Sequence, residues 1–257
     1  MRLYLAGLEG ANNKNEYQLD LSPDNLVLTS FYYCTDKVIT WLIDNIGVDN
    51  ILLDSGAFTF IMHGLKGVDI DEYIDNYIKF INKYDIKYFF EMDIDRNFDE
   101  LAKVKEYRKR IEQGTGKKCI PVWHKTRGID EWRDIVDNYD YIAIGGITSG
   151  VDKNYASIIK NMVKYANSHK TKVHGLGYNK KDLLDFGFYS CDATTWNGGA
   201  YGKIFEFKRS VGYPVGTQSV QMGKRMRTEV QPAVFKHNFK VWSTYQKYLR
   251  NKGVWRD

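Results

Sequence analysis

Eight short apolar runs recur along the chain at fairly even spacing, and they constrain its fold more than any other feature. Most are continuous, rich in β-branched and aromatic residues, and bounded by Gly, Asp or Ser. This pattern is typical of strands that are covered on both faces. The runs occupy residues 2–7, 25–30, 51–56, 87–93, 119–124, 141–146, 172–177 and 189–196.

Helical patterns fill many of the gaps between these runs. Residues 69–84 place their apolar side chains on one helix face, and residues 97–114 begin with acidic residues and stop at Gly114. The same reasoning predicts helices in three further gaps, at 128–139, 154–169 and 180–188. Alternating strands and helices indicate a parallel sheet with helices outside it.

A (β/α)8 barrel accounts best for this alternation. The strand count is near eight, and the chain of 257 residues is close to the roughly 250 residues typical of that fold. A doubly wound open sheet is the alternative, but it usually carries a G-x-G-x-x-G turn after its first strand, and LAGLEGANN does not fit. We therefore predict an α/β fold, with a TIM-like barrel over 1–202 and a basic, mainly helical C-terminal extension over 203–257, packed on or extending the barrel.

The C-terminal extension holds most of the excess positive charge. Residues 203–257 carry twelve Lys or Arg against three Asp or Glu, although the whole chain has a net charge of only +5. Cations alternate with aromatic rings there, which suits a phosphate-backbone partner, because cations neutralise phosphates and rings stack on bases. The alternative is a solvated helix face. The candidate nucleic-acid contacts are Lys224, Arg225 and Arg227.

The sequence also argues against several classes of protein. No apolar run approaches the roughly 20 residues that span a bilayer, and the N-terminal apolar stretch is too short for a secretory signal. We therefore expect a cytoplasmic protein with no membrane partner. The three cysteines, Cys34, Cys119 and Cys191, are far apart and form no C-x-x-C pair, which argues against a disulfide framework and a paired-cysteine zinc site.

Polar residues and glycines gather where the predicted strands end. In a (β/α)8 barrel, these ends meet at one mouth, which carries the chemistry. Each residue also has a simpler interpretation: the Gly pair would serve only a tight turn, and a histidine would be a satisfied core residue. A His₂-carboxylate metal site is a further alternative. The strand-end residues are Asp54, Ser55, Gly56, Asp93, His124, Gly145, Gly146, His174, Gly175 and Asp192.

These segments, in this order, resemble the tRNA-guanine transglycosylase superfamily, especially its shorter phage and bacterial members that insert 7-deazaguanines into DNA. DSGAFT is similar to the D-S-G-G-F-Q signature of that family, and AIGG to its Gly-Gly base platform. The tRNA enzymes also carry a zinc module with a C-x-C-x-x-C run, and no such run is present here. The resemblance covers DSGAFT (54–59), EMD (91–93), PVWH (121–124), AIGG (143–146), VHGLG (173–177) and CDATTW (191–196).

The resemblance implies base exchange through a covalent intermediate. Asp192 would be the nucleophile that attacks C1′ of a guanosine or deoxyguanosine nucleotide, and Asp54 would be the general acid/base. The co-substrate would be a free 7-deazaguanine base such as preQ0 or preQ1, with no other cofactor and no metal. Since two carboxylates near one anionic substrate repel, we expect at least one raised pKa in the site without ligand.

The resemblance also implies how the base is read. Asp93 would accept hydrogen bonds from the base, Gly146 would donate its N–H to O6 with help from His124, and Phe58 would stack on the ring. Thr59 and His124 stand where the tRNA enzymes have glutamines, which leaves the accepted base open. The remaining strand-end residues are predicted to line the base pocket: Ser55, Gly56, Gly145, His174 and Gly175.

Three other functions stay open at this point. The same chemistry could act on tRNA, His124 and His174 could serve a metal-dependent barrel hydrolase, or the barrel could bind nucleic acid without catalysis. The absent zinc module, which helps to dock tRNA in the resembled family, favours DNA as the partner. A homodimer also remains open, as does the host cytoplasm as location if the gene belongs to a phage.

Overall fold

Eight parallel strands form the centre of the molecule in the computed structural model, which describes residues 1–9, 19–63, 69–94, 100–147, 152–220, 224–253 and 255. Each strand lies within one of the eight predicted apolar runs, so all eight are confirmed. They are β1 (Arg2–Ala6), β2 (Val27–Ser30), β3 (Ile51–Asp54), β4 (Tyr88–Phe89), β5 (Val122–Trp123), β6 (Tyr141–Ile144), β7 (Lys172–Gly175) and β8 (Ser190–Ala193).

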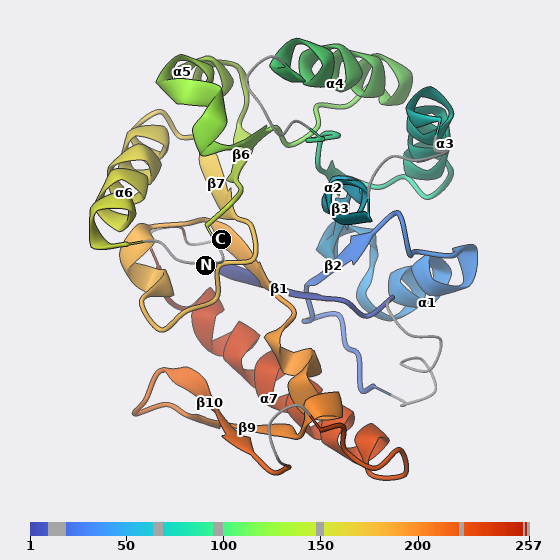
Figure 1. Ribbon diagram of the computed structural model, residues 1–257, viewed down its shortest axis with the longest axis vertical. Helices are drawn as coiled ribbons and strands as arrows, with labels where there is room; N and C mark the ends of the chain where they lie inside the picture. The colour runs from blue at the N-terminus through green and yellow to red at the C-terminus, as the bar shows by residue number, and fades with distance from the viewer. Residues whose placement is uncertain are drawn as a thin grey trace.

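The strands close into a ring. Their order in the sheet is β4-β3-β2-β1-β8-β7-β6-β5, and every pair is parallel. A parallel bridge between Phe90 and Ile120 then joins the β4 and β5 ends, where Ile120 N–H donates to Phe89 O at 2.8 Å. The predicted (β/α)8 barrel is confirmed, and Figure 1 shows helices arranged around the strands.

The helices follow most of the strands. The predicted segment 97–114 is helical from Leu101, and residues 97–99 lie outside the described part, while segment 180–188 holds only the short 3₁₀ helix η4 (Leu183–Phe186). No helix in the described ranges is both long and apolar enough to cross a membrane. The α-helices are α1 (Asp36–Ile46), α2 (Ala57–His63), α3 (Ile70–Lys83), α4 (Leu101–Thr115), α5 (Gly128–Asn138), α6 (Lys153–Ser168) and α7 (Gln231–Arg250).

Two apolar layers lie on either side of the strand ring. One fills the barrel interior and includes Tyr4, Leu52, Phe90 and Val122, and the other packs between the strands and the helices. Side chains alternate along a strand, so residues two positions apart share a face. The residues two positions after Leu52 and Val122, which are Asp54 and His124, therefore continue the inward-facing rows toward the mouth.

The C-terminal segment begins with a structure that was not predicted. Strands β9 (Lys203–Lys208) and β10 (Tyr213–Gln218) form an antiparallel hairpin, and α7 follows it. Gln246 on α7 donates to Leu3 O and Leu26 O at 2.7 Å each, and Trp242 is fully buried. Helix α7 thus packs against β1 and takes the place of the helix that follows the eighth strand.

Candidate active site

Three aspartates from three different strand ends gather at the mouth of the barrel. Asp54 is the last residue of β3, Asp192 lies in β8, and Asp93 follows β4. The charges of Asp93 and Asp192 both act on Asp54 and raise its pKa, which requires the three carboxyl groups to be near one another. The parallel direction of the strands brings these distant sequence positions to one edge.

Asp54 has a perturbed carboxyl group. Burial raises the pKa of Asp54 to about 7, the charges of Asp93 and Asp192 act in the same direction, and a hydrogen bond from Gly56 N–H opposes them. That N–H donates to Oδ2 at 3.0 Å. The expectation of a raised pKa in the site is therefore confirmed. A group with this pKa can both give and take a proton near neutral pH.

Asp192 is held by one oxygen only. Its Oδ1 accepts a hydrogen bond from Gly177 N–H at 2.6 Å and lies 3.2 Å from His174 Nε2. Within the described part of the chain, Oδ2 has no hydrogen-bond partner. The side chain is 10% exposed, so the carboxylate is fixed in a nearly buried position with one oxygen unused.

His124 pairs with Asp93 and covers part of the predicted glycine platform. Its Nε2 lies 2.8 Å from Asp93 Oδ2. A Cβ added at Gly145 would come within 2.4 Å of His124 Cε1, whereas one at Gly146 would meet nothing closer than 3.9 Å. The interpretation of both glycines as bare backbone for a ligand is thus corrected: the His124 ring lies against Gly145, and Gly146 is the exposed one.

His174 and Gly175 lie behind the mouth. His174 is fully buried and contacts Tyr4 and Phe90 in the barrel interior. A Cβ at Gly175 would come within 2.9 Å of the Phe188 ring, so this glycine allows tight packing. Direct contact of either residue with a ligand in the mouth is not compatible with these positions, because the side chains of strand β7 are covered there.

The residues that follow β3 have different surroundings. Ser55 is fully buried, and its carbonyl oxygen accepts a hydrogen bond from Tyr73 at 2.7 Å. Gly56 has φ +86°, and a Cβ there would lie 2.8 Å from Tyr32 Cβ, so glycine is needed for the turn. Phe58 on α2 is 71% exposed, which leaves its ring available for stacking.

One more carboxylate at this end of the barrel was missed. Glu9, three residues after β1, accepts hydrogen bonds from Ser30 N–H and Thr29 Oγ1 at 3.2 Å each. The signal was present in the sequence, because Glu9 follows the first apolar run as the other acidic residues follow theirs. Gly177 was also missed, since its contribution is a backbone N–H that no residue type reveals.

The predicted basic contacts lie on the surface next to the end of the segment that follows β8. Lys224, Arg225 and Arg227 are exposed, and the Arg225 guanidinium lies 5.6 Å from the centroid of the Tyr201 ring. Tyr201 ends the 3₁₀ helix η5 (Thr195–Tyr201), which leaves the Asp192 strand. Trp196 near the start of η5 donates to Ala6 O at the end of β1 at 2.9 Å, so η5 begins at this edge of the barrel, and Arg225 contacts its last residue.

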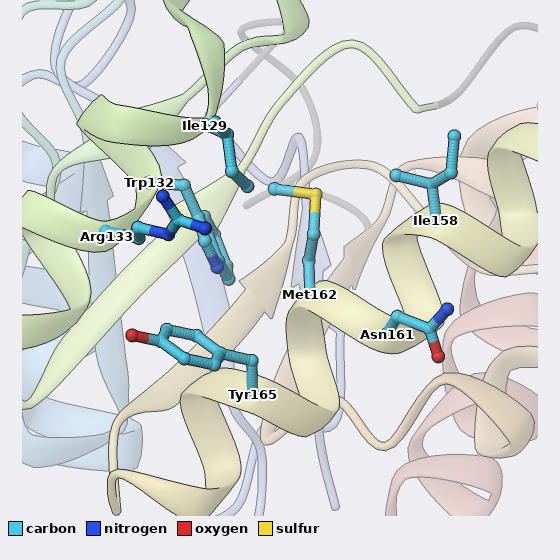
Figure 2. Close-up of a pocket in the computed structure, with 7 residues that line it drawn as sticks. All are labelled: Ile129, Trp132, Arg133, Ile158, Asn161, Met162 and Tyr165. Atoms are coloured by element: carbon cyan, nitrogen blue, oxygen red, sulfur yellow. The ribbon is translucent and has the colours of Figure 1, made fainter.

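Other features of the described residues lie away from this arrangement. A groove of about 280 Å³ opens between α5 and α6, where Trp132 and Met162 face each other (Figure 2), but it contributes no side chain to the mouth. Across the described ranges, no three His, Cys, Asp or Glu side chains are placed so that they could hold a metal ion.

Comparison with known proteins identifies no family. No family model and no curated protein matches the chain. The carboxyl transferase domain of Rhizobium etli pyruvate carboxylase with 3-bromopyruvate matches at 12% identity and a TM-score of 0.49, over 97% of this chain and 47% of that one. The same domain with 3-hydroxypyruvate matches at 13% identity and a TM-score of 0.47, over 98% of this chain and 48% of that one. The chain thus spans about half the length of these structures, and likeness at this level says nothing of substrate or reaction.

Proposed function

We propose that this protein is a base-exchange transglycosylase, an enzyme that replaces guanine in DNA with a free 7-deazaguanine base. The observation that carries the proposal is the pair of unlike carboxyl groups at the mouth. Asp192 is anchored through Oδ1 and keeps Oδ2 unused, and Asp54 has a pKa of about 7. One group is suited to attack, and the other to proton transfer.

In the first step, Asp192 Oδ2 bonds to C1′ of the nucleotide while the bond from C1′ to guanine N9 breaks. A carboxylate suits this step, because its charge offsets the positive charge that develops at the anomeric carbon. Asp54 in its protonated form gives its proton to the departing guanine. The products are free guanine and a glycosyl ester on Asp192.

In the second step, the incoming 7-deazaguanine reverses this chemistry. Asp54, now ionised, accepts the proton from N9 of the free base, and N9 forms the new bond to C1′. The ester bond to Asp192 breaks, and its electron pair returns to the carboxylate. A pKa of about 7 suits both directions of proton transfer at neutral pH.

The base would be read by groups that surround the two carboxylates. Asp93, held by His124 at 2.8 Å, would accept hydrogen bonds from N1–H and the exocyclic amine. The exposed Gly146 N–H would donate to O6, and the Phe58 ring, 71% exposed, would stack on the base. Because His124 covers Gly145, its ring edge can also border the base.

DNA must present the target base outside the helical stack. Flipping a base costs a few kcal/mol, which phosphate contacts offset. Lys224, Arg225 and Arg227 would supply these contacts from the segment beside η5. We favour DNA over tRNA because the chain lacks the cysteine run that, in the resembled family, belongs to a tRNA-docking zinc module.

The proposal is tested by incubating the protein with a 7-deazaguanine base and either DNA or tRNA, then measuring the modified nucleosides by mass spectrometry. We expect 7-deazaguanine in the DNA sample and an Asp192-dependent covalent protein–DNA adduct. Asp192→Asn should abolish both, whereas Asp185→Asn, a change at an exposed carboxylate in η4, should leave both unchanged. The proposal is contradicted if neither DNA nor tRNA is modified, or if the Asp192→Asn variant still exchanges the base.

A further inference from the structure

We infer that three hydrogen-bonded side chains, those of Tyr141, Ser190 and His174, form a positioning chain that selects which oxygen of Asp192 attacks. The inference rests on the proposed function, since it takes Asp192 as the nucleophile. Tyr141 Oη lies 2.5 Å from Ser190 Oγ, Ser190 Oγ lies 2.7 Å from His174 Nδ1, and His174 Nε2 lies 3.2 Å from Asp192 Oδ1.

This positioning chain of hydrogen bonds runs through the barrel interior from the end opposite the mouth to the mouth itself. Tyr141 and Ser190 are the first residues of β6 and β8, whereas His174 and Asp192 are the third residues of β7 and β8. His174 and Ser190 are fully buried. Any effect of the chain on a substrate must therefore pass through Asp192, so these residues act by positioning and not by contact.

The hydrogen atoms can be assigned by counting donors. An ionised Asp192 only accepts, so His174 Nε2 carries a hydrogen and the neutral ring accepts at Nδ1. Ser190 then donates its single hydrogen to Nδ1 and accepts from Tyr141. Burial raises the pKa of Tyr141 well above its usual value, so this phenol keeps its proton. Every hydrogen in the chain has an acceptor.

A doubly protonated His174 would break this sequence. His174 Nδ1–H would then donate to Ser190 Oγ, so one hydroxyl hydrogen, that of Ser190 or that of Tyr141, would have no acceptor among the described residues. A buried hydroxyl hydrogen without an acceptor is costly. The chain therefore fixes the tautomer of His174 with hydrogen on Nε2, in the way that a third group orients the base of a catalytic triad.

The fixed tautomer has one consequence for Asp192. Oδ1 accepts from His174 Nε2–H and from Gly177 N–H, the latter at 2.6 Å. Two donors on one oxygen hold the carboxylate plane and leave Oδ2 as the oxygen that can reach C1′. Removing the His174 donor should therefore slow the attack without changing how the base is bound, which is a loss in kcat and not in KM.

Two variants of His174 separate positioning from simple packing. Gln can place an amide N–H near the position of Nε2, whereas Leu fills similar space without a donor. We expect His174→Leu to lower kcat about 100-fold, as is typical when one donor is removed from an active site, with KM for the free base unchanged. His174→Gln should recover at least tenfold of that loss. Equal losses in the two variants would overturn the inference.

A second measurement does not depend on activity and stays decisive if a variant fails to fold. The ¹⁵N chemical shifts of His174 in the full-length, unliganded protein report which ring nitrogen carries hydrogen. We expect the Nε2–H form in the natural sequence and a mixture of forms in Ser190→Ala. Predominance of the Nδ1–H form or of imidazolium refutes the inference even if base exchange is observed. Conversely, an inactive protein with the Nε2–H form would contradict the proposed function alone.

Discussion

Two carboxyl groups at the ends of neighbouring strands have opposite surroundings. Glu91 follows β4 and is completely buried. Its carboxylate forms ion pairs with Arg127 Nη1 at 2.6 Å and Arg108 Nε at 2.5 Å. Burial alone would raise the pKa of Glu91, but the two guanidinium groups outweigh it and hold the pKa below its usual value. Asp54 ends β3, and no Lys or Arg of the described chain forms an ion pair with it; its pKa is raised to about 7.

The difference separates a carboxylate that stabilises the fold from one that the proposed reaction would use for proton transfer. Glu91 also accepts a hydrogen bond from Val122 N–H at 2.8 Å, and Arg108 reaches Glu131 on α5 at 3.1 Å. This network joins β4, β5, α4 and α5, and it keeps Glu91 ionised over the whole neutral range. Asp54 has no such compensation, so its charge is unstable near neutral pH, which is the property that proton transfer requires.

The largest effect on stability is expected from Glu91→Gln. The change keeps the shape of the side chain but removes the buried negative charge that Arg127 and Arg108 share, and the loss of one partner from a buried ion pair typically costs about 3–5 kcal/mol. Denaturant unfolding at pH 7 measures this loss. Asp137→Asn, at an exposed position on the same barrel wall, should change the free energy of unfolding by less than about 0.5 kcal/mol. A loss below 1 kcal/mol for Glu91→Gln would show that the network is not a structural element.

The sequence predicted the strand-end position of Asp54 but not the buried arginine partners of Glu91. Strands covered on both faces are encoded locally as apolar runs, and parallel strands place their ends at one edge, so Asp54, Asp93 and Asp192 could be grouped. Arg108, in contrast, lies within a charged helical segment and resembles the exposed cations around it. Only the packing of α4 against the barrel turns it inward, and that packing depends on contacts distant in the sequence.

The same limit explains why the predicted roles of His174 and Gly145 changed. The sequence predicts His174 and Gly175 as the last residues of their strand, and β7 does end at Gly175. The His174 ring nevertheless lies in the barrel interior against Tyr4 and Phe90, where it is fully buried. For Gly145, the sequence shows that a side chain is absent and cannot show that another residue, His124, fills the space.

Asp54→Asn should produce a smaller effect of the opposite sign. Because the folded-state pKa of about 7 lies above the ordinary 3.8, the folded state binds more protons than the unfolded state between these values, so the free energy of unfolding falls as pH rises through this window. Asn cannot ionise, so the free energy of unfolding of the variant does not fall in this way as the pH rises. We expect the variant to be more stable than the natural protein by up to about 4 kcal/mol at pH 8, and equal to it at pH 3.

Unfolding curves at several pH values measure this difference. Asp44→Asn, at an exposed position on α1, should show no comparable dependence on pH. A stability difference for Asp54→Asn that is the same at pH 3 and pH 8 would show that Asp54 is not the titrating group. A lower stability of the variant at pH 8 would show that its charge is compensated in the folded protein, as that of Glu91 is.

The comparison extends to the cations. Arg108 and Arg127 are buried and neutralised by Glu91, whereas Lys224, Arg225 and Arg227 are exposed, and no ion pair to a carboxylate is found for them among the described residues. A buried, paired cation serves the fold. An exposed cation without a carboxylate partner keeps its full charge for a phosphate group.

The smallest effect is expected when these three cations are replaced together by Gln. DNA affinity at 0.1 M salt should fall about tenfold, and the slope of log K against log salt should become shallower by about 2 to 3, because up to three fewer counterions are released. The matched control removes the same charge from Lys83, Lys103 and Arg110, which pair with carboxylates on α1, α3 and α4. Fluorescence anisotropy at several salt concentrations measures both. If the two triple variants weaken binding equally, net charge alone attracts DNA, and the segment beside η5 is not its docking surface.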